Sequence, residues 1–296
     1  MADAMRDEVA SQADRLKKRL KKAHAGGEKG VHKARTELRR LRVELDTMGH
    51  TAFDPRVTAK LERRLHTIER ALAKTRDTDV LLADVRAHRE LADVCKRLER
   101  RRKRAAASAR KALDRKTRSA LDARLRRAVK PKHVIIAAPR NPARAAPVLV
   151  RHFTHREIWR RYDALRAYDA RLPADVATLH KLRSACRELR FTLEAFETAV
   201  RALEPIARAL HQLQDEMGEL HDHQVAIELL EKWRRKGKIR STEALDRYLA
   251  RRAEARDELR SASEPRWLRV LGESFRLGLA RALEGQAQIT TPRIAA

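Results

Sequence analysis

Two segments, half a chain apart, carry a histidine followed by three arginines at the same spacing. The first contains His32, Arg35, Arg39 and Arg42, and the second repeats these residue types as His180, Arg183, Arg187 and Arg190. An arginine guanidinium is a planar fork of donors that matches two phosphate oxygens, and a histidine can gain a proton beside an anion. Steps of three and four residues place one donor about every 5–6 Å along a helix. The pattern therefore indicates binding of an extended, repetitively charged anion rather than a single small metabolite.

The first segment is predicted to present its cations on one face of a helix. At about 100° per residue, the four basic residues share an arc of about 80°. The adjacent arc is apolar and contains Val31, Ala34, Leu38, Leu41 and Leu45. The glutamates of both segments, Glu37, Glu44 and Glu188, lie on the far arc, whereas a merely solvated face would interleave them for pairing one turn away. Because like charges one turn apart repel, we expect an anion between the cations.

A second basic row is predicted on the following helix of each half. The first half has it as Arg63, His66, Arg70 and Lys74. The second half retains Arg208 and His211, but carboxylates replace the other two cations, so the first half is expected to carry more of the binding. Asp77 and Asp222 are expected to orient a neighbouring arginine or cap backbone groups. The full set of candidate polyanion-binding residues is His32, Lys33, Arg35, Arg39, Arg40, Arg42, Arg63, His66, Arg70, Lys74, His180, Lys181, Arg183, Arg187, Arg190, Arg208 and His211.

The repeat predicts an all-α fold of two four-helix bundles that arose by internal duplication. Long stretches rich in Ala, Leu, Arg, Glu and Lys favour helix over strand, and short turns between long helices favour bundles. The expected helices span residues 3–25, 28–48, 55–90 and 92–129 in the first half and 147–171, 174–200, 203–236 and 241–284 in the second. Four prolines exclude helix between residues 131 and 147. The expected organisation is a first half at 1–130, a linker at 131–147, a second half at 148–285 and a flexible tail at 286–296.

The composition limits the class of protein. The 296 residues include 69 Lys and Arg against 41 Asp and Glu, a formal net charge of +28. Self-repulsion of this size is best relieved by an anionic partner. There is no run of about 18 apolar residues to span a bilayer, the N-terminal stretch lacks the apolar core of a signal peptide, and two cysteines cannot form a disulfide framework. These features predict a soluble, cytoplasmic protein without a transmembrane segment.

Three stretches resemble the CHAD family, the conserved histidine α-helical domain. They run from His32 to Arg42, from His180 to Phe191, and from Leu213 to Val225, where the sequence includes Leu-His-Asp-His. The resemblance covers nearly the whole chain and implies two bundles related by a pseudo-twofold axis, with a basic surface that binds inorganic polyphosphate. Some members of that family associate with polyphosphate or polyhydroxyalkanoate granules, so the resemblance also implies such an association for this protein. Two departures are Glu188, which replaces an expected basic residue, and a degenerate first copy of the third-helix motif at residues 73–77.

The expected function is non-catalytic binding of inorganic polyphosphate in a groove lined by basic residues of both bundles. We expect affinity to fall between about pH 6 and 8 as the histidines lose charge. Sequence-independent nucleic-acid binding is the alternative, because the run of Arg and Lys at 100–104 could contact phosphates. Aromatic residues, however, make up only 4% of the chain, which leaves few platforms for stacking bases.

Catalysis and metal binding are not expected. The chain has no Gly-rich phosphate loop and no β-rich segment, and no cofactor is predicted. A metal site would have to use His211, His221, Asp222 and His223. Residues two apart on a helix point away from each other, so this set is not predicted to bind a metal ion.

Overall fold

The computed structural model describes all residues except 1, 131–149, 169–175, 198–199, 241 and 285–296. The predicted linker at 131–147 and the predicted tail at 286–296 lie outside the described residues. Within the described residues, regular structure consists of helices and short 3₁₀ turns without a strand, which confirms the all-α prediction. None of the described helices has the length and apolar character needed to cross a membrane.

The chain divides into two compact units. The first contains α1 (Ala2–His24), α2 (Glu28–Ala52), α3 (Pro55–Val85), the 3₁₀ turn η1 (Arg89–Leu91), α4 (Ala92–Ala112) and α5 (Arg115–Ala128), together with the segment Trp233–Leu245. The second contains α6 (Val150–Arg166), α7 (Val176–Phe196), the 3₁₀ turn η4 (Arg201–Leu203), α8 (Glu204–Arg235) as far as Lys232, α9 (Glu243–Leu271) from Asp246 onward, and α10 (Glu273–Glu284). The last turn of α8 and the start of α9 therefore belong to the first unit.

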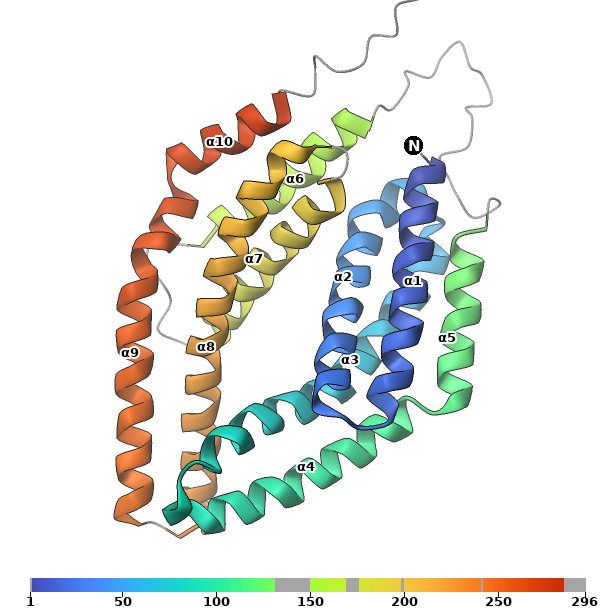
Figure 1. Ribbon diagram of the computed structural model, residues 1–296. Coiled ribbons are helices and arrows are strands. Elements are labelled where there is room, and N and C mark those ends of the chain that lie inside the picture. The colour runs from blue at the N-terminus through green and yellow to red at the C-terminus, as the bar shows by residue number, and fades with distance from the viewer. Residues whose placement is uncertain (1, 131–149, 169–175, 198–199, 241, 285–296) are drawn as a thin grey trace, which may run out of the picture. The chain divides into compact units, whose positions relative to one another are not determined.

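The first unit contains a four-helix bundle made by α1, α2, the first part of α3 and α5, with α4 paired along the second part of α3 (Figure 1). The predicted apolar stripe of α2 lies at its centre, with exposures of 0–1% for Val31, Ala34, Leu38, Leu41 and Leu45. The matching stripe of α3 contains Leu61, Leu65, Ile68 and Leu72, all equally buried. Removal of these side chains from water is the main driving force for the bundle.

The predicted helix at 92–129 is two helices, so a single fourth helix was wrong. α4 ends at Ala112 and α5 begins at Arg115. The carboxylate of Asp114 accepts a hydrogen bond from the backbone N–H of Thr117 (2.6 Å) and thereby caps a new helix. As a result α5 completes the bundle, and α4 is free to pair with the end of α3. The predicted helix at 241–284 is likewise interrupted, at Gly272 between α9 and α10.

Two glycines allow the close pairing of α1 and α2. Gly26, in the turn between them, has a φ of +85°, a left-handed conformation that glycine adopts without steric penalty. A Cβ at Gly30 would lie 2.9 Å from the carbonyl oxygen of Lys22, which is closer than real Cβ atoms approach. Gly30 therefore lets the two backbones meet and holds the apolar stripe of α2 inside the bundle.

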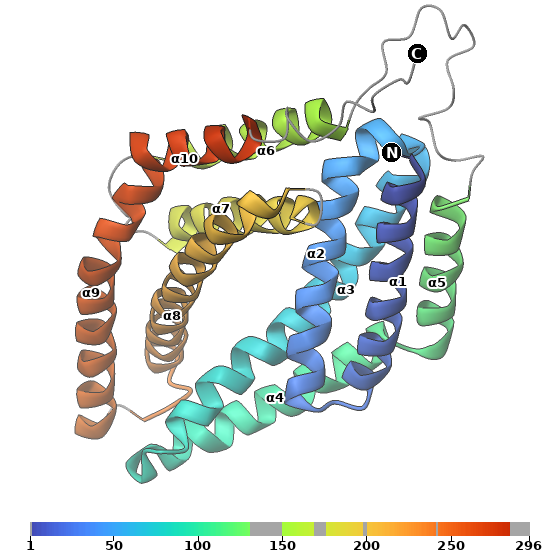
Figure 2. The same cartoon turned by 45° about the horizontal axis from the view of Figure 1, so that its top comes forward.

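Aromatic side chains form the centre of the second unit. The hydroxyl of Tyr162 in α6 donates to the carbonyl oxygen of Val270 (3.1 Å), and its ring stacks on Phe275 of α10 with centroids 5.6 Å apart. Trp267 of α9 is fully buried. Figure 2 shows α6 beside α10, and α7 beside α8. The predicted stripe of α7 is buried as well and contains Leu179, Leu182, Cys186, Leu189 and Leu193.

Candidate basic binding site

Helix α2 carries the first predicted row, called the α2 row here: His32, Lys33, Arg35, Arg39, Arg40 and Arg42. His32 and Lys33 are exposed, whereas Arg35 is buried. The other three members are partly buried. The row therefore begins at the surface and then enters the contact between α2 and α3.

Carboxylates do pair with the α2 row, which corrects the expectation that it would be left for an external anion. Arg35 donates from Nη1 to Oδ1 of Asp77 (3.1 Å). Arg39 donates from Nε to Oε1 of Glu69 (2.8 Å), and Arg42 pairs with the other oxygen of the same carboxylate. Both acids belong to α3, so the face pattern of α2 alone does not reveal them. Asp77 does orient an arginine, as predicted.

Glu69 is held ionised by the two arginines that it contacts. Burial by itself would raise the pKa of its carboxyl group, but the hydrogen bonds and positive charges of Arg39 and Arg42 lower that pKa below its usual value. A guanidinium has five N–H donors, so one carboxylate orients it without using all of them. Arg39 and Arg42 are therefore pre-oriented donors rather than fully neutralised ones.

Helix α3 carries the second predicted row, called the α3 row here: Arg63, His66, Arg70 and Lys74. All four side chains are exposed. Within the described part of the chain, none of them forms an ion pair with a carboxylate. They follow one another at helical-turn spacing on the face next to Glu69 and Asp77. The basic surface of the first unit thus combines oriented arginines on α2 with accessible cations on α3.

His32, at the start of the α2 row, lies among arginines. Although the side chain is exposed, the surrounding protein desolvates part of its imidazole and lowers its pKa, and the charges of Arg76, Arg35 and Arg39 lower that pKa further, against a smaller opposing effect of Glu28. The side chain is therefore neutral at pH 7 in the free protein and serves as a hydrogen-bonding group rather than a cation. A bound phosphate would favour its protonated form.

The second copy of the motif brings two histidines and an arginine together between α7 and α8. The rings of His180 and His221 have centroids 5.5 Å apart and are inclined by 40°. Arg183 lies against Gly218, where a Cβ would be 3.5 Å from its Nη2 atom. His221 and Gly218 were not among the predicted site residues. The available signal was a glycine in the middle of a strongly helical stretch, which often marks a close approach.

Further along α7, the predicted row takes part in packing. Arg190 is buried, with its guanidinium 4.5 Å from the ring centroid of Phe191 and 3.5 Å from the carboxylate of Glu194. Arg187 is partly buried, and Lys181 is exposed. Arg190 therefore mainly stabilises the packing of the second unit. The accessible basic groups of α7 lie nearer the N-terminus of that helix.

The two predicted cations of α8 are each paired within their own helix. Arg208 forms an ion pair with Glu204, and Nδ1 of His211 lies 2.9 Å from the carboxylate of Asp215. The corresponding α3 row has no such partners in the described residues. This difference supports the expectation that the two halves are not equivalent and that the first offers more accessible positive charge.

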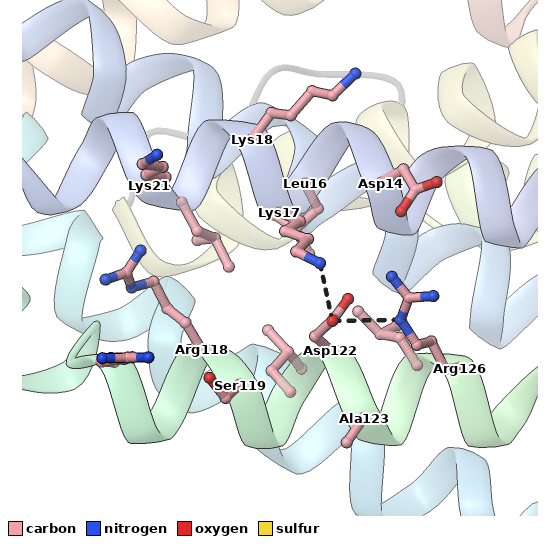
Figure 3. A pocket seen from close by; sticks show the side chains of 14 residues that line it. Asp14, Leu16, Lys17, Lys18, Lys21, Arg118, Ser119, Asp122, Ala123 and Arg126 are labelled. Carbon is pink, nitrogen blue, oxygen red and sulfur yellow. Dashed lines mark hydrogen bonds and ion pairs between the residues drawn. The ribbon is translucent and has the colours of Figure 1, made fainter.

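A separate cavity lies between α1 and α5 (Figure 3). The helices contribute buried leucines to its lining, namely Leu16, Leu20, Leu121 and Leu125. Lys17 reaches across to Asp122 (2.9 Å), and Arg126 contacts the same carboxylate (3.3 Å). Because an ion pair bridges the cavity and the leucines belong to the bundle core, this is a helix–helix contact and not part of the basic site.

Two observations bear on other chemistry. Among the described residues, no group of three or more His, Cys, Asp and Glu side chains is arranged to hold a metal ion. Cys186 is fully buried, and burial raises the pKa of its thiol to about 12. The thiol is therefore protonated and inaccessible at neutral pH, which excludes it as a nucleophile.

The comparisons with known proteins point to one family. The model of the CHAD domain matches residues 8–231. Among solved structures, the chain is similar to PptA from Streptomyces chartreusis, with a TM-score of 0.63 and 18% identity over 96% of this chain and 99% of that one. It is also similar to the CHAD domain from the plant Ricinus communis, with a TM-score of 0.56 and 20% identity over 99% of this chain and 93% of that one. A comparison with curated proteins found no match. The two structural likenesses show the fold alone, whereas the family match covers most of the chain, and the protein therefore belongs to the CHAD domain family.

Proposed function

We propose that this CHAD domain protein binds inorganic polyphosphate without altering it chemically. The observation that carries the proposal is the α3 row, whose four basic side chains are exposed and have no carboxylate partner in the described residues. The arginines of the α2 row lie beside it, already oriented by Glu69 and Asp77. Family membership and the net charge of +28 support the same ligand.

A row of cations at helical-turn spacing fits a polymer better than a small molecule. A hydrogen bond to a charged group contributes about 1.5–3 kcal/mol. Once one phosphate is bound, the linked phosphates reach the next cation at high effective concentration, so weak contacts along the row reinforce one another. The proposal extends to the second unit, where His180, His221 and Arg183 offer the same kinds of donors. One long polymer would then engage basic residues from both halves.

The absence of catalysis is part of the proposal. Hydrolysis or transfer of a phosphoryl group needs a group that activates the nucleophile or protonates the leaving oxygen. The carboxylates that pair with the α2 row are Glu69 and Asp77, and both are bound to arginines. The lowered pKa of Glu69 keeps it ionised at neutral pH and unsuited to act as an acid. These residues orient the donors and leave the phosphate chain intact.

We further propose that the protein collects in the cytoplasm where its ligand accumulates, including polyphosphate and polyhydroxyalkanoate granules. A polymer-binding protein concentrates on a polymer-rich surface by multivalent contact. A fluorescent fusion should therefore follow polyphosphate in cells, and the α3-row variant described below should lose that distribution.

The decisive experiment reverses charge on the α3 row. The double variant Arg63→Glu/Arg70→Glu should bind long-chain polyphosphate at least about tenfold more weakly, because two phosphate contacts become repulsive. The control is Arg124→Glu/Arg127→Glu on α5, which changes the net charge equally at two exposed positions. Isothermal titration calorimetry gives both affinities, and far-ultraviolet circular dichroism checks that the helices persist. Equal losses in the two variants would contradict a site on α3.

Nucleic-acid binding is the second candidate, favoured by the exposed basic residues of α4, which include Arg100, Lys103 and Arg104. Competition separates the two functions where salt dependence does not, since any polyanion releases counterions. We expect long-chain polyphosphate to displace duplex DNA at a far lower phosphate concentration than the reverse. The opposite order would favour nucleic acid as the ligand.

A further inference from the structure

The cavity between α1 and α5 lies outside the α2 and α3 rows. The two helices run antiparallel beside it, and they leave a volume of about 760 Å³ (Figure 3). We propose that this cavity, called the α1–α5 cavity here, binds a free fatty acid, which is a single alkyl chain with a carboxylate head. The proposal adds a ligand that carries no phosphate, and it does not depend on polyphosphate binding.

Leucines form the base of the α1–α5 cavity. Leu16 and Leu20 come from α1, and Leu121 and Leu125 come from α5. Because the leucines of each helix are four residues apart, they lie on the same face, one turn from each other. Each of the four is at most 3% exposed, so the methylene stems of the surrounding lysines and arginines supply the apolar walls above them. An alkyl chain bound there would replace water against apolar surface.

Three cations lie together at one end of the cavity. Figure 3 shows Lys21 of α1 and Arg118 of α5 at the same end, and Arg115 lies about one turn before Arg118 on its helix. The Nε atom of Arg118 donates to the carbonyl oxygen of Leu113 (2.9 Å), which orients its guanidinium. Within the residues that the structure describes, none of the three cations forms an ion pair with a carboxylate. This end can therefore accept a carboxylate, for which arginine offers two parallel donors.

The middle and the other end of the cavity contain their own counter-charges. The carboxylate of Asp122 accepts from Lys17 (2.9 Å) and from Arg126 (3.3 Å). Asp14 lies at the same end as Arg126 (Figure 3). An anionic head is therefore drawn to the end with Lys21 and not to the rest of the cavity. This polarity matches a molecule with one anionic head and an apolar tail, and it does not match a polymer that is charged along its whole length.

The size and closure of the α1–α5 cavity also fit a small guest. Its volume falls within the roughly 300–1,000 Å³ that is usual for small-ligand pockets. Helix bundles are normally packed densely, and α1 meets α2 at backbone distance through Gly30, so the open space is specific to the side of α5. The ion pair of Lys17 with Asp122 crosses this space, but the Lys17 side chain is 53% exposed. An ion pair exposed in this way contributes little to stability and can open to admit an alkyl chain.

The test removes charge at the head end and compares neighbouring residues. Lys21→Gln/Arg115→Gln neutralises two exposed cations that line the cavity, whereas Lys22→Gln/Lys116→Gln neutralises the exposed cations that follow them and do not line it. Both variants lose the same charge, so the general attraction of an anion to this basic protein changes equally. Calorimetric titration with sodium dodecanoate should show roughly tenfold weaker binding for the first variant and a change of less than about threefold for the second.

Chain length tests the apolar part of the cavity. With octanoate, decanoate and dodecanoate, the affinity of the unsubstituted protein should rise about two- to fourfold for each added methylene, because each methylene is removed from water. Hydrogen exchange then locates the ligand. Dodecanoate should protect the backbone amides of residues 14–21 and 115–126 and leave those of residues 63–74, which include most of the α3 row, unchanged.

Several results would overturn the proposal. Equal losses in the two double variants, or no measurable binding of dodecanoate, would mean that the head end is not a site. An affinity that does not change with chain length would mean that only the carboxylate is bound. Protection of residues 63–74 in place of α1 and α5 would place the fatty acid on the α3 row.

Two further comparisons separate the α1–α5 cavity from other ligands. If Lys21→Gln/Arg115→Gln loses sedimentation with phosphatidylglycerol vesicles but keeps its affinity for dodecanoate, the surface meets a lipid bilayer and the fatty-acid proposal is wrong. Failure of the polyphosphate proposal is recognised independently. It appears in the Arg63→Glu/Arg70→Glu variant with long-chain polyphosphate, and that variant should bind dodecanoate no differently from Arg124→Glu/Arg127→Glu.

Discussion

At the scale of single residues, the carboxylates decide which cations are available to a ligand. Arg39 and Arg42 share Glu69 and are held in place, whereas Arg70 on the adjacent helix face is exposed and has no carboxylate partner in the described part of the chain. All three look alike in the sequence. The difference arises because α2 and α3 pack side by side and bring their polar edges together. Accessibility, and not residue type alone, therefore distinguishes the α3 row from the α2 arginines as candidate binding residues.

His32 determines one part of the pH dependence. Its pKa lies below the usual value near 6.5 in the free protein because of burial and the neighbouring arginines. A bound polyanion raises that pKa, so complex formation takes up a proton. Affinity for long-chain polyphosphate should therefore increase as the pH falls, and because the pKa of free His32 is lowered, the increase should continue below the reference value of about 6.5, beyond the lower part of the window of pH 6 to 8 expected from the sequence.

Calorimetry measures this proton uptake directly. Titrations at pH 6 in two buffers with different ionisation enthalpies should give different observed heats, and His32→Gln should reduce the difference. Identical heats in both buffers, together with an unchanged profile for His32→Gln, would mean that His32 does not change its protonation on binding.

At the scale of helices, capping and close approach place the basic faces. Asp114 lies between two helices and caps the second, so that α5 closes the bundle while arginines of α4 line a pocket together with Lys74. Gly30 lets α1 and α2 meet at backbone distance. Helix boundaries of this kind depend on single hydrogen bonds and single missing methyl groups rather than on average propensity.

Gly30→Ala should destabilise the first unit despite the better helix propensity of alanine. The propensity gain is about 1 kcal/mol, but the new Cβ would lie 2.9 Å from the Lys22 carbonyl oxygen, and overpacking against backbone costs about 1–3 kcal/mol. Gly27→Ala is the matched control, because nothing lies within 4 Å of its Cβ position. Urea unfolding should show a lower midpoint for Gly30→Ala only. An unchanged or higher midpoint would show that α1 moves away without cost.

At the scale of the whole molecule, the net charge of +28 opposes compactness. The carboxylates of Glu69, Asp77 and Asp79 are already counted in that net charge, so their ion pairs with arginines relieve repulsion locally but leave the net charge unchanged. The chain can fold despite this excess positive charge because the apolar cores of the two units are well buried. A bound polyanion, as proposed above, would remove repulsion that folding concentrates.

Added salt should stabilise the protein. Raising potassium chloride from about 10 to about 150 mM shortens the screening length from about 30 to about 8 Å. Screening weakens both the ion pairs and the general repulsion, and at this net charge the relief of repulsion is the larger effect. The thermal midpoint should therefore rise by several degrees. A midpoint that falls with salt would show that the internal ion pairs outweigh the repulsion.

Much of the helix content and the positions of the apolar stripes could be predicted from the sequence. The stripe at Leu38, Leu41 and Leu45 is buried as expected, because helical period alone determines which side chains share a face. The break at Asp114 was missed although Asp followed by Thr three residues later is compatible with a cap. The pocket lined by Lys74, arginines of α4 and Lys238 could not be predicted, because it joins residues that are up to 164 positions apart.

By itself, the sequence determined that the protein is helical, strongly basic, and equipped with two sets of histidine and arginine at helical spacing. These properties follow from composition and local period, which do not depend on what a helix packs against. Only the tertiary structure decided that Glu69 and Asp77 hold the α2 arginines, that the α3 row remains accessible, and that the arginines of α4 meet Lys238 around a pocket. The physical reason is that ion pairing acts through space over a few ångströms, and the packing of distant segments sets those distances.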